Sequence, residues 1–274
     1  MHPVSIHKIL APVDFSRRAE GAVRSARRLA AHFDAELIVL HVMEPFHVDY
    51  AMVEPFEGSL RHLADENLAK KRAQLDAFLA HELEGVKVTR RIVEGDAAGE
   101  ILQSSRRENT DLVVMPTQGR GRLHGLLIGS VTSKVLDESE RPVLTGTHLE
   151  QDGGPNDWQF HNIHCAIDLG TRTGSVLGWG KAMAKEFGAK VTVLHVSSDP
   201  EAGSRVAKAV EAAGLQAETL IMEGEPHKLV SAAAEQLKAD LVIIGRGTAT
   251  STLGRLRAQA YGIVRQAPCP VLSV

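Results

Sequence analysis

The sequence predicts an α/β protein made of two tandem, open, parallel five-stranded sheets, each flanked by helices. Three observations lead to this prediction. Short apolar runs alternate with longer amphipathic runs, no Asn-Gly hairpin turn separates the apolar runs, and the whole pattern occurs twice in 274 residues. Alternating strands and helices require parallel strands joined by right-handed crossovers, with helices on both faces of the sheet.

The duplication is visible in motifs that recur at nearly constant offsets. Asp14 and Asp168 each end an apolar run and lie 154 positions apart, whereas the Asp-Leu-Val motifs that begin at Asp111 and Asp240 lie 129 positions apart. A closing Pro-Val-Leu motif recurs after 128 positions. Each half is therefore one structural unit, and the second unit lacks 154 − 129 = 25 residues after its second strand.

A polar, breaker-rich stretch separates the two units. We expect a first unit over 1–148, a linker over 149–160 and a second unit over 161–274. Apolar runs predict strands over 6–13, 36–43, 86–93, 112–115 and 142–147, and again over 162–168, 190–196, 217–222, 241–245 and 270–274. Amphipathic runs predict helices over 17–33, 60–84, 97–108 and 129–139, and again over 172–187, 202–214, 227–238 and 254–266.

Four of these elements carry further signals. Ser16 is the expected N-cap of the first helix. The second helix is expected to present one apolar stripe, formed by Leu63, Leu68, Leu75, Phe78 and Leu79. The final strand of each unit is apolar, and an exposed apolar edge invites pairing with another strand.

The composition limits which partners the protein can bind and in which cellular compartment we expect it. Thirty-one basic and 34 acidic residues give a formal net charge of −3, which favours neither nucleic acid nor an acidic membrane surface. No run of 18 apolar residues predicts a membrane span, and Met1–Pro3 lacks a charged-then-apolar leader. Cys165 and Cys269 lie in apolar runs and are expected to be buried thiols in a reducing compartment. We therefore expect a cytoplasmic protein.

The strongest chemical signal follows the fourth strand of the first unit. In open parallel sheets, ligands bind beyond the carboxyl ends of the strands. The loop over 116–130 contains four glycines and enters a helix at Gly129-Ser130, where free N–H groups and the helix dipole attract anions. Arg120 and Arg122 add positive charge. The loop predicts a phosphate cradle, and the alternative is a flexible glycine loop with a capping serine.

These motifs resemble the universal stress proteins in their tandem two-domain form, and the resemblance spans essentially the whole chain. Nine residues separate Gly119 from Gly129, Ser130 follows directly, and Asp14 ends the first strand, as in the nucleotide-binding members of that family. The resemblance implies a Rossmann-like fold of the adenine nucleotide alpha hydrolase type. Pro116 departs from the family pattern because it replaces a motif glycine and removes a backbone N–H.

The resemblance also implies a site for ATP, with Mg²⁺ bridging the phosphate oxygens. Asp14 would lie near the ribose and phosphates, and the main chain at Val42 would hydrogen-bond the adenine. The residues implied for nucleotide binding are Pro12, Asp14, Val42, Gly119, Gly129, Ser130 and Val131. On the residues alone, Asp14 is open to a second interpretation as a cap for the first helix, and Val42 to one as a core residue.

The second unit keeps less of this pattern. Asp168 is retained, but Ala166 stands at the position of Pro12, and Arg257-Ala258 replace the Gly-Ser pair at the helix entrance. A bulky cation there would occupy the space that a phosphate needs, so we expect a degenerate site. The alternative is that Arg257 binds an anion directly.

The most economical function is a nucleotide-binding stress-response or regulatory module, with no catalytic residue and no protein-bound metal assigned. Two alternatives stay open: a slow ATP-hydrolysing enzyme, and a stress protein that binds no nucleotide and acts by protein interaction. Buried or strand-edge roles suit His41 and His195 better than catalysis. The expected partners are an adenine nucleotide and, within the chain, a pseudo-dimer of the two units through their final strands, with a homodimer also possible.

Overall fold

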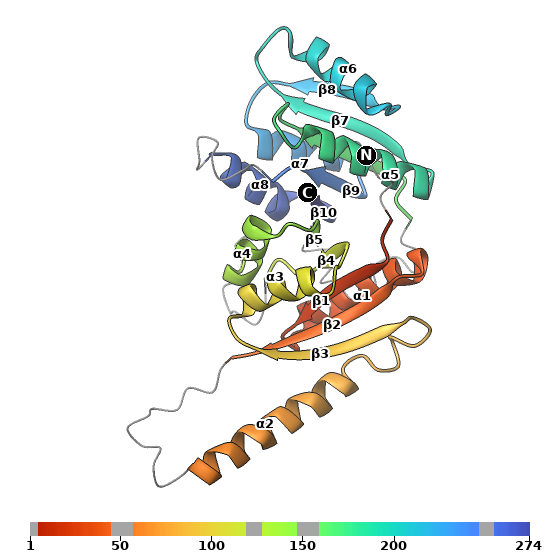
Figure 1. Cartoon of the computed structure of the whole chain (residues 1–274). Helices are drawn as coiled ribbons and strands as arrows, with labels where there is room; N and C mark the ends of the chain where they lie inside the picture. Colours follow the sequence, from red (N-terminus) through yellow and green to blue (C-terminus); the bar gives the residue numbers. More distant parts are fainter. Residues whose placement is uncertain (1–4, 45–56, 119–127, 147–158, 247–254) are drawn as a thin grey trace.

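The computed structural model describes residues 5–44, 57–118, 128–146, 159–246 and 255–274 (Figure 1). The elements of the first unit are β1 (Lys8–Val13), α1 (Arg17–Phe33), β2 (Glu36–Met43), α2 (Glu57–Ala77), β3 (Val88–Glu94), α3 (Ala97–Arg107), β4 (Leu112–Val114), α4 (Ser130–Glu138) and β5 (Val143–Thr145). Those of the second unit are β6 (Asn162–Ile167), α5 (Thr173–Phe187), β7 (Lys190–Val196), α6 (Ala202–Ala213), β8 (Glu218–Met222), α7 (Pro226–Gln236), β9 (Leu241–Ile244), α8 (Arg255–Gln266) and β10 (Val271–Ser273). The predicted α/β class is confirmed.

The strands of the described residues form one continuous sheet of ten, in the order β3-β2-β1-β4-β5-β10-β9-β6-β7-β8. Each half of the sheet is parallel, and the halves meet where β5 pairs antiparallel with β10. Leu144 lies opposite Leu272, its counterpart 128 positions later. The expected pairing of the final strands is thus confirmed, and the two predicted sheets are joined through it (Figure 1).

A pseudo-two-fold axis relates the two units. Besides the paired leucines, Phe33 at the end of α1 meets its counterpart Phe187 at the end of α5, with ring centroids 5.9 Å apart. The neighbouring positions differ between the units: His32 stacks on Phe187, and its Nε2 lies 3.1 Å from Glu186 Oε1. Phe160 packs against Phe187 as well and is buried. One apolar core therefore runs across both units on the face covered by α1 and α5.

The opposite face of the sheet is covered by α3 and α4 in the first unit and by α7 and α8 in the second. Helix boundaries follow local signals. Ser16 is the N-cap of α1, and its side chain accepts a hydrogen bond from the backbone N–H of Ala19. At the other end, Asp34 adopts the left-handed conformation that closes the helix.

The prediction for α2 was wrong in two respects. The helix ends at Ala77, nine residues after Leu68, and turns occupy the chain up to residue 86. The expected apolar stripe is buried only near this end: Leu75 is fully buried, whereas Leu63 and Leu68 are 50% and 45% exposed. The helix projects beyond β3 at the edge of the sheet (Figure 1), so only its last turn meets the core.

Both cysteines are free and buried, as expected. Burial raises the pKa of the Cys165 thiol and of the Cys269 thiol to about 12, so both stay protonated at neutral pH. Among the described residues, no helix is long and apolar enough to cross a membrane.

Candidate functional site

A cavity of about 550 Å³ lies at the carboxyl edge of the first unit, beyond the ends of β1, β2 and β4. Its walls are mainly apolar and come from the strand ends, α1, α3 and the start of α4. Among the residues that the sequence indicated, those that line it are Pro12, Asp14, Val42, Gly129, Ser130 and Val131. Gly119, Arg120 and Arg122 lie outside the described residues.

A strained turn fixes Asp14 at this cavity. Its Oδ1 accepts hydrogen bonds from the backbone N–H of Ser16 at 3.0 Å and from the Ser16 hydroxyl at 2.6 Å. Between them, Phe15 has a φ of 61°, in the left-handed region that a bulky residue enters at a cost in conformational energy. The Phe15 ring lies 4.4 Å from His41, whose buried Nδ1 donates to the carbonyl of Val13 at 2.8 Å. Asp14 therefore supports the helix cap, Ser16, and faces the ligand edge as well.

The second unit repeats this turn. Leu169 has a φ of 58°, Asp168 Oδ1 accepts a hydrogen bond from Gly170 N–H at 2.8 Å, and His195 Nδ1 donates to the carbonyl of Ile167 at 2.8 Å. His41 and His195 are both buried. They hold the ends of neighbouring strands together, which agrees with the structural role expected from the sequence.

The start of α4 is the candidate anion site. Gly129 is its N-cap and brings no side chain to satisfy the first N–H groups of the helix, in contrast to α3, where Asp96 accepts from Gly99 N–H at 2.9 Å. Two hydrogen bonds connect this turn to the residues that follow β4. Gly129 N–H donates to Thr117 O at 2.8 Å, and the Thr132 hydroxyl donates to Pro116 O at 3.0 Å.

Pro116 thus contributes a carbonyl that fastens the first turn of α4, although it lacks the N–H of the family glycine. It is buried and lines the cavity. The departure seen in the sequence removes a donor but leaves the N-terminal end of α4, the candidate anion site, anchored.

A much smaller cavity, of about 110 Å³, occupies the matching place in the second unit. Most of its lining residues are counterparts of residues that line the first cavity, at the offsets of 154, 129 and 128, but the counterparts of Arg172, Val176 and Ile263 do not line the first cavity. Three replacements add side-chain bulk: Thr173 stands where the first unit has Ala19, Pro226 where it has Ala97, and Gln259 where it has Val131. The second site is therefore reduced in volume, as well as altered in its loop.

A hydrogen-bonded pair draws α7 and α8 together beside this smaller cavity. Gln259 Oε1 accepts from the backbone N–H of His227 at 3.0 Å and from its ring Nδ1 at 2.8 Å. Gly262 leaves the room that His227 needs, because a Cβ there would lie 2.6 Å from the His227 Cβ. The side chains of Arg257 and Ala258, on which the sequence prediction rested, lie outside the described part of the chain.

Other candidates from the sequence contribute little to the site. Among the described residues, no cluster of three or more His, Cys, Asp or Glu side chains is arranged to hold a metal ion. The basic residues of α1 are partly committed to the turns after α2: Arg24 contacts Glu82, and Arg27 Nη2 donates to the carbonyl of Glu84 at 3.1 Å.

Comparison with known proteins agrees with this architecture. The profile of the universal stress protein family matches residues 5–145 and 199–274. The chain belongs to the universal stress protein family. A tandem universal stress protein fold is also what the ten-stranded sheet shows, since each half carries one family match.

Individual relatives match one unit or the whole chain. Universal stress protein MJ0577 of Methanocaldococcus jannaschii is 31% identical over 155 residues, which make up 52% of this chain and 94% of that protein. A Thermus aquaticus universal stress protein is 36% identical over 136 residues, 50% of this chain and 95% of that protein. The solved structure of a universal stress protein from Archaeoglobus fulgidus covers 98% of this chain and 96% of its own, with a TM-score of 0.72 at 24% identity.

One solved universal stress protein was determined in complex with cAMP; it covers 42% of this chain at 20% identity, with a TM-score of 0.36.

Proposed function

We propose that the first unit binds one ATP per chain, with Mg²⁺ on its phosphates, and that the chain is a cytoplasmic stress-response regulator with a mainly structural second unit. The contrast between the two cavities carries this proposal. At matching positions the first unit encloses about 550 Å³ and the second about 110 Å³. Ligand pockets typically measure about 300–1,000 Å³, so only the first has the room for a nucleotide.

The chemistry of the first cavity suits an adenine nucleotide. Its apolar walls can sandwich a flat base, with the main chain at Val42 available for hydrogen bonds, and the Asp14 carboxylate at the cavity can accept a hydrogen bond from a ribose hydroxyl. The uncapped amides at Ser130 and Val131 offer donors to phosphate oxygens. Mg²⁺ prefers oxygen ligands and is commonly held through substrate phosphates, so the oxygen donors of Asp14 and Ser130 fit it.

Binding, without efficient hydrolysis, is the output that we propose. Hydrolysis needs a base that orients the attacking water. Asp14 is the carboxylate at this cavity among the described residues, and its Oδ1 already accepts two hydrogen bonds from Ser16. A signal would then be read from the nucleotide-bound form of the chain.

Calorimetric titration with Mg-ATP tests the proposal. We expect a ratio near one ATP per chain, and the nucleotide released on denaturation of the purified protein should be adenine-based. A ratio of two would mean that the second unit binds as well, and no binding would favour a stress protein that acts by protein interaction alone.

Variants at the helix entrance test the phosphate assignment. Gly129→Arg should abolish ATP binding while the chain stays folded, because the new side chain would occupy the anion site. Ser130→Ala should cost about 0.5–2 kcal/mol of binding free energy through one lost hydrogen bond. Gly203→Arg is the matched control, since Gly203 lies at the exposed start of α6 and its Cβ position is free of neighbours within 4 Å. Normal ATP binding by Gly129→Arg would refute the cradle.

A further inference from the structure

The short helix α4 connects the candidate phosphate site to the interface between the units. It contains nine residues and is therefore about 14 Å long. Its N-terminal amides face the cavity, and its C-terminal carbonyls face the second unit. In a rigid element of this length, a tilt at one end displaces the other, so contacts at the C-terminal end act together with the hydrogen bonds to Thr117 and Pro116 in setting the direction of the amides.

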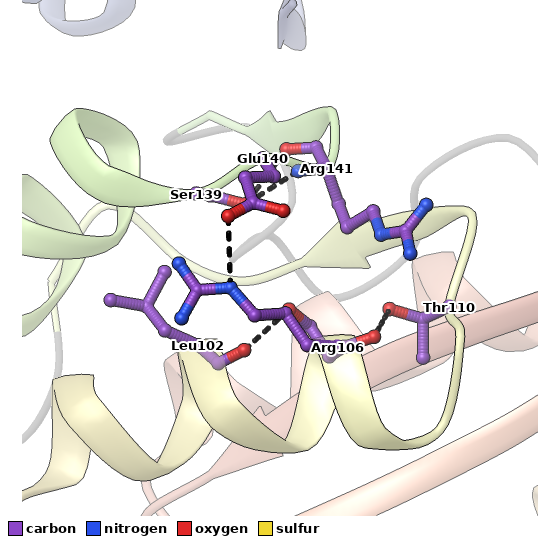
Figure 2. Close-up of polar contacts among 7 residues, drawn as sticks. Leu102, Arg106, Thr110, Ser139, Glu140 and Arg141 are labelled. Atoms are coloured by element: carbon purple, nitrogen blue, oxygen red, sulfur yellow. Dashed lines mark hydrogen bonds and ion pairs between the residues drawn. The ribbon is translucent and has the colours of Figure 1, made fainter.

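Contacts with its own unit hold α4 from the side of α3. Lys134 Nζ lies 3.0 Å from Asp96 Oδ2. In the turn after α4, Glu140 Oε1 accepts a hydrogen bond from Arg106 Nε at 3.1 Å, as Figure 2 shows. The side chains of these pairs are 45–67% exposed. Exposed ion pairs contribute little to rigidity because water competes for both partners.

Side chains of the second unit make less exposed hydrogen bonds to backbone carbonyls of α4 and of the turn after it. Arg246, which follows β9, donates from Nη1 to the carbonyl of Leu136 at 3.3 Å and from Nη2 to the carbonyl of Arg141 at 2.9 Å. Tyr261 Oη, on α8, donates to the carbonyl of Ser133 at 3.2 Å. Arg246 and Tyr261 therefore reach α4 and the turn after it at three carbonyls.

The charge of Arg246 complements this helix. The last turn of α4 has no basic residue of its own, and it contains Asp137 and Glu138, which oppose the helix dipole. Burial, together with the neighbouring Arg172, lowers the pKa of Arg246 to about 10, and Asp137 counteracts this shift. The guanidinium stays protonated at neutral pH and supplies the cation that the C-terminal end of α4 lacks.

The arrangement is one-sided. Tyr261 is the pseudo-two-fold counterpart of Ser133, and Arg246 is the counterpart of Thr117, so the first unit offers a short hydroxyl where the second offers a guanidinium. Helix α8, in contrast, carries Arg265 in its own last turn. The helix that receives the arginine from the other unit is the one beside the larger cavity.

We infer that Arg246 and Tyr261 of the second unit are positioning residues that hold the phosphate-binding end of α4 in the first unit. This inference rests on the proposed function. It gives the second unit a role in nucleotide binding although its own cavity is small: it sets the orientation of amides at the other site.

The test separates the phosphates from the rest of the nucleotide. Titrations with ATP and with adenosine are compared for the wild-type chain, Arg246→Met, Arg246→Lys and Tyr261→Phe. We expect Arg246→Met to weaken ATP binding about three- to tenfold and adenosine binding less than twofold. Arg246→Lys should recover part of the loss, and Tyr261→Phe should show a smaller change of the same kind. The control is Arg205→Met, which removes an arginine of α6 that pairs with Asp199 and should change neither the ATP affinity nor the adenosine affinity.

A second measurement is independent of the nucleotide. Amide hydrogen exchange over residues 128–138 should be faster in Arg246→Met than in Arg205→Met. An equal loss of ATP and adenosine affinity, or an unchanged ratio in both Arg246→Met and Tyr261→Phe, would overturn the inference. If the wild-type chain binds neither compound, the proposed function fails; faster exchange would then still support the positioning of α4, and equal exchange would refute it.

Discussion

The pair formed by Cys165 and Gly180 provides a sharp test of the packing that joins strand and helix in the second unit. Both residues are buried, and a Cβ added at Gly180 would overlap the Cys165 sulfur. In the first unit the corresponding residues are Ala11 and Ala26. The first unit therefore has a methyl side chain on both the strand and the helix, whereas the second has a larger side chain on the strand and no side chain on the helix. We expect Gly180→Ala to be strongly coupled to Cys165→Ala.

The magnitudes follow from the contacts. Gly180→Ala should gain about 1 kcal/mol of helix propensity and lose about 1–3 kcal/mol through overpacking. Cys165→Ala should lose about 1–2 kcal/mol by leaving a cavity. The double variant reproduces the Ala–Ala pair of the first unit and should lie within about 1 kcal/mol of the wild type, which gives a coupling free energy of about 2 kcal/mol. Urea unfolding of the four proteins measures it, and additivity within about 0.5 kcal/mol would refute the argument.

Two further predictions concern pH and assembly. His164 is buried, and its Nδ1 lacks a hydrogen-bond partner among the described residues. Burial lowers the pKa of His164, so below pH 6.5 the unfolded chain binds more protons than the folded one. The free energy of unfolding therefore falls as the pH falls through this range. His164→Leu, which copies Leu10 of the first unit, should raise the free energy of unfolding by about 1 kcal/mol at pH 7 and flatten its decline toward pH 5 in urea titrations; an unchanged slope would contradict this. The isolated fragment 1–148 exposes the edge of β5 that β10 covers in the full chain, so we expect it to self-associate in light scattering at high concentration, and a strictly monomeric fragment would count against the explanation of the duplication.

Much of the fold could be predicted because its signals are local. The bounds of α1, β2 and β7 agree with the prediction to the residue, since apolar periodicity and the Ser16 cap mark them directly. The stripe on α2 could not be judged in this way. Spacing shows that Leu63 and Leu68 can share a helix with Leu75, but it does not show how far the rest of the fold covers them, and both are about half exposed.

The residues of the candidate site also fall into those marked by local sequence signals and those that depend on long-range contacts. Asp14 and the Gly129–Val131 turn are encoded in contiguous motifs, and the structure brings them to one cavity. His227 and Gln259 were missed because they interact across 32 residues, and Arg246 because it reaches across 110. A position-by-position comparison of the two units could have found the first pair, since it shows two polar residues where the first unit has apolar ones.

The contact between His32 and Glu186 has a consequence for how chains recognise their own halves. These residues occupy equivalent positions beside the pseudo-two-fold axis. In an assembly of two identical first units, histidine would face histidine, and in one of two second units, glutamate would face glutamate. Only the unlike combination places a donor opposite an acceptor, with Phe187 stacked on the imidazole. Fusion of the two units therefore allowed the surface of each unit beside the axis to change independently. As a result, the first unit fits the second unit of its own chain better than it fits a copy of itself.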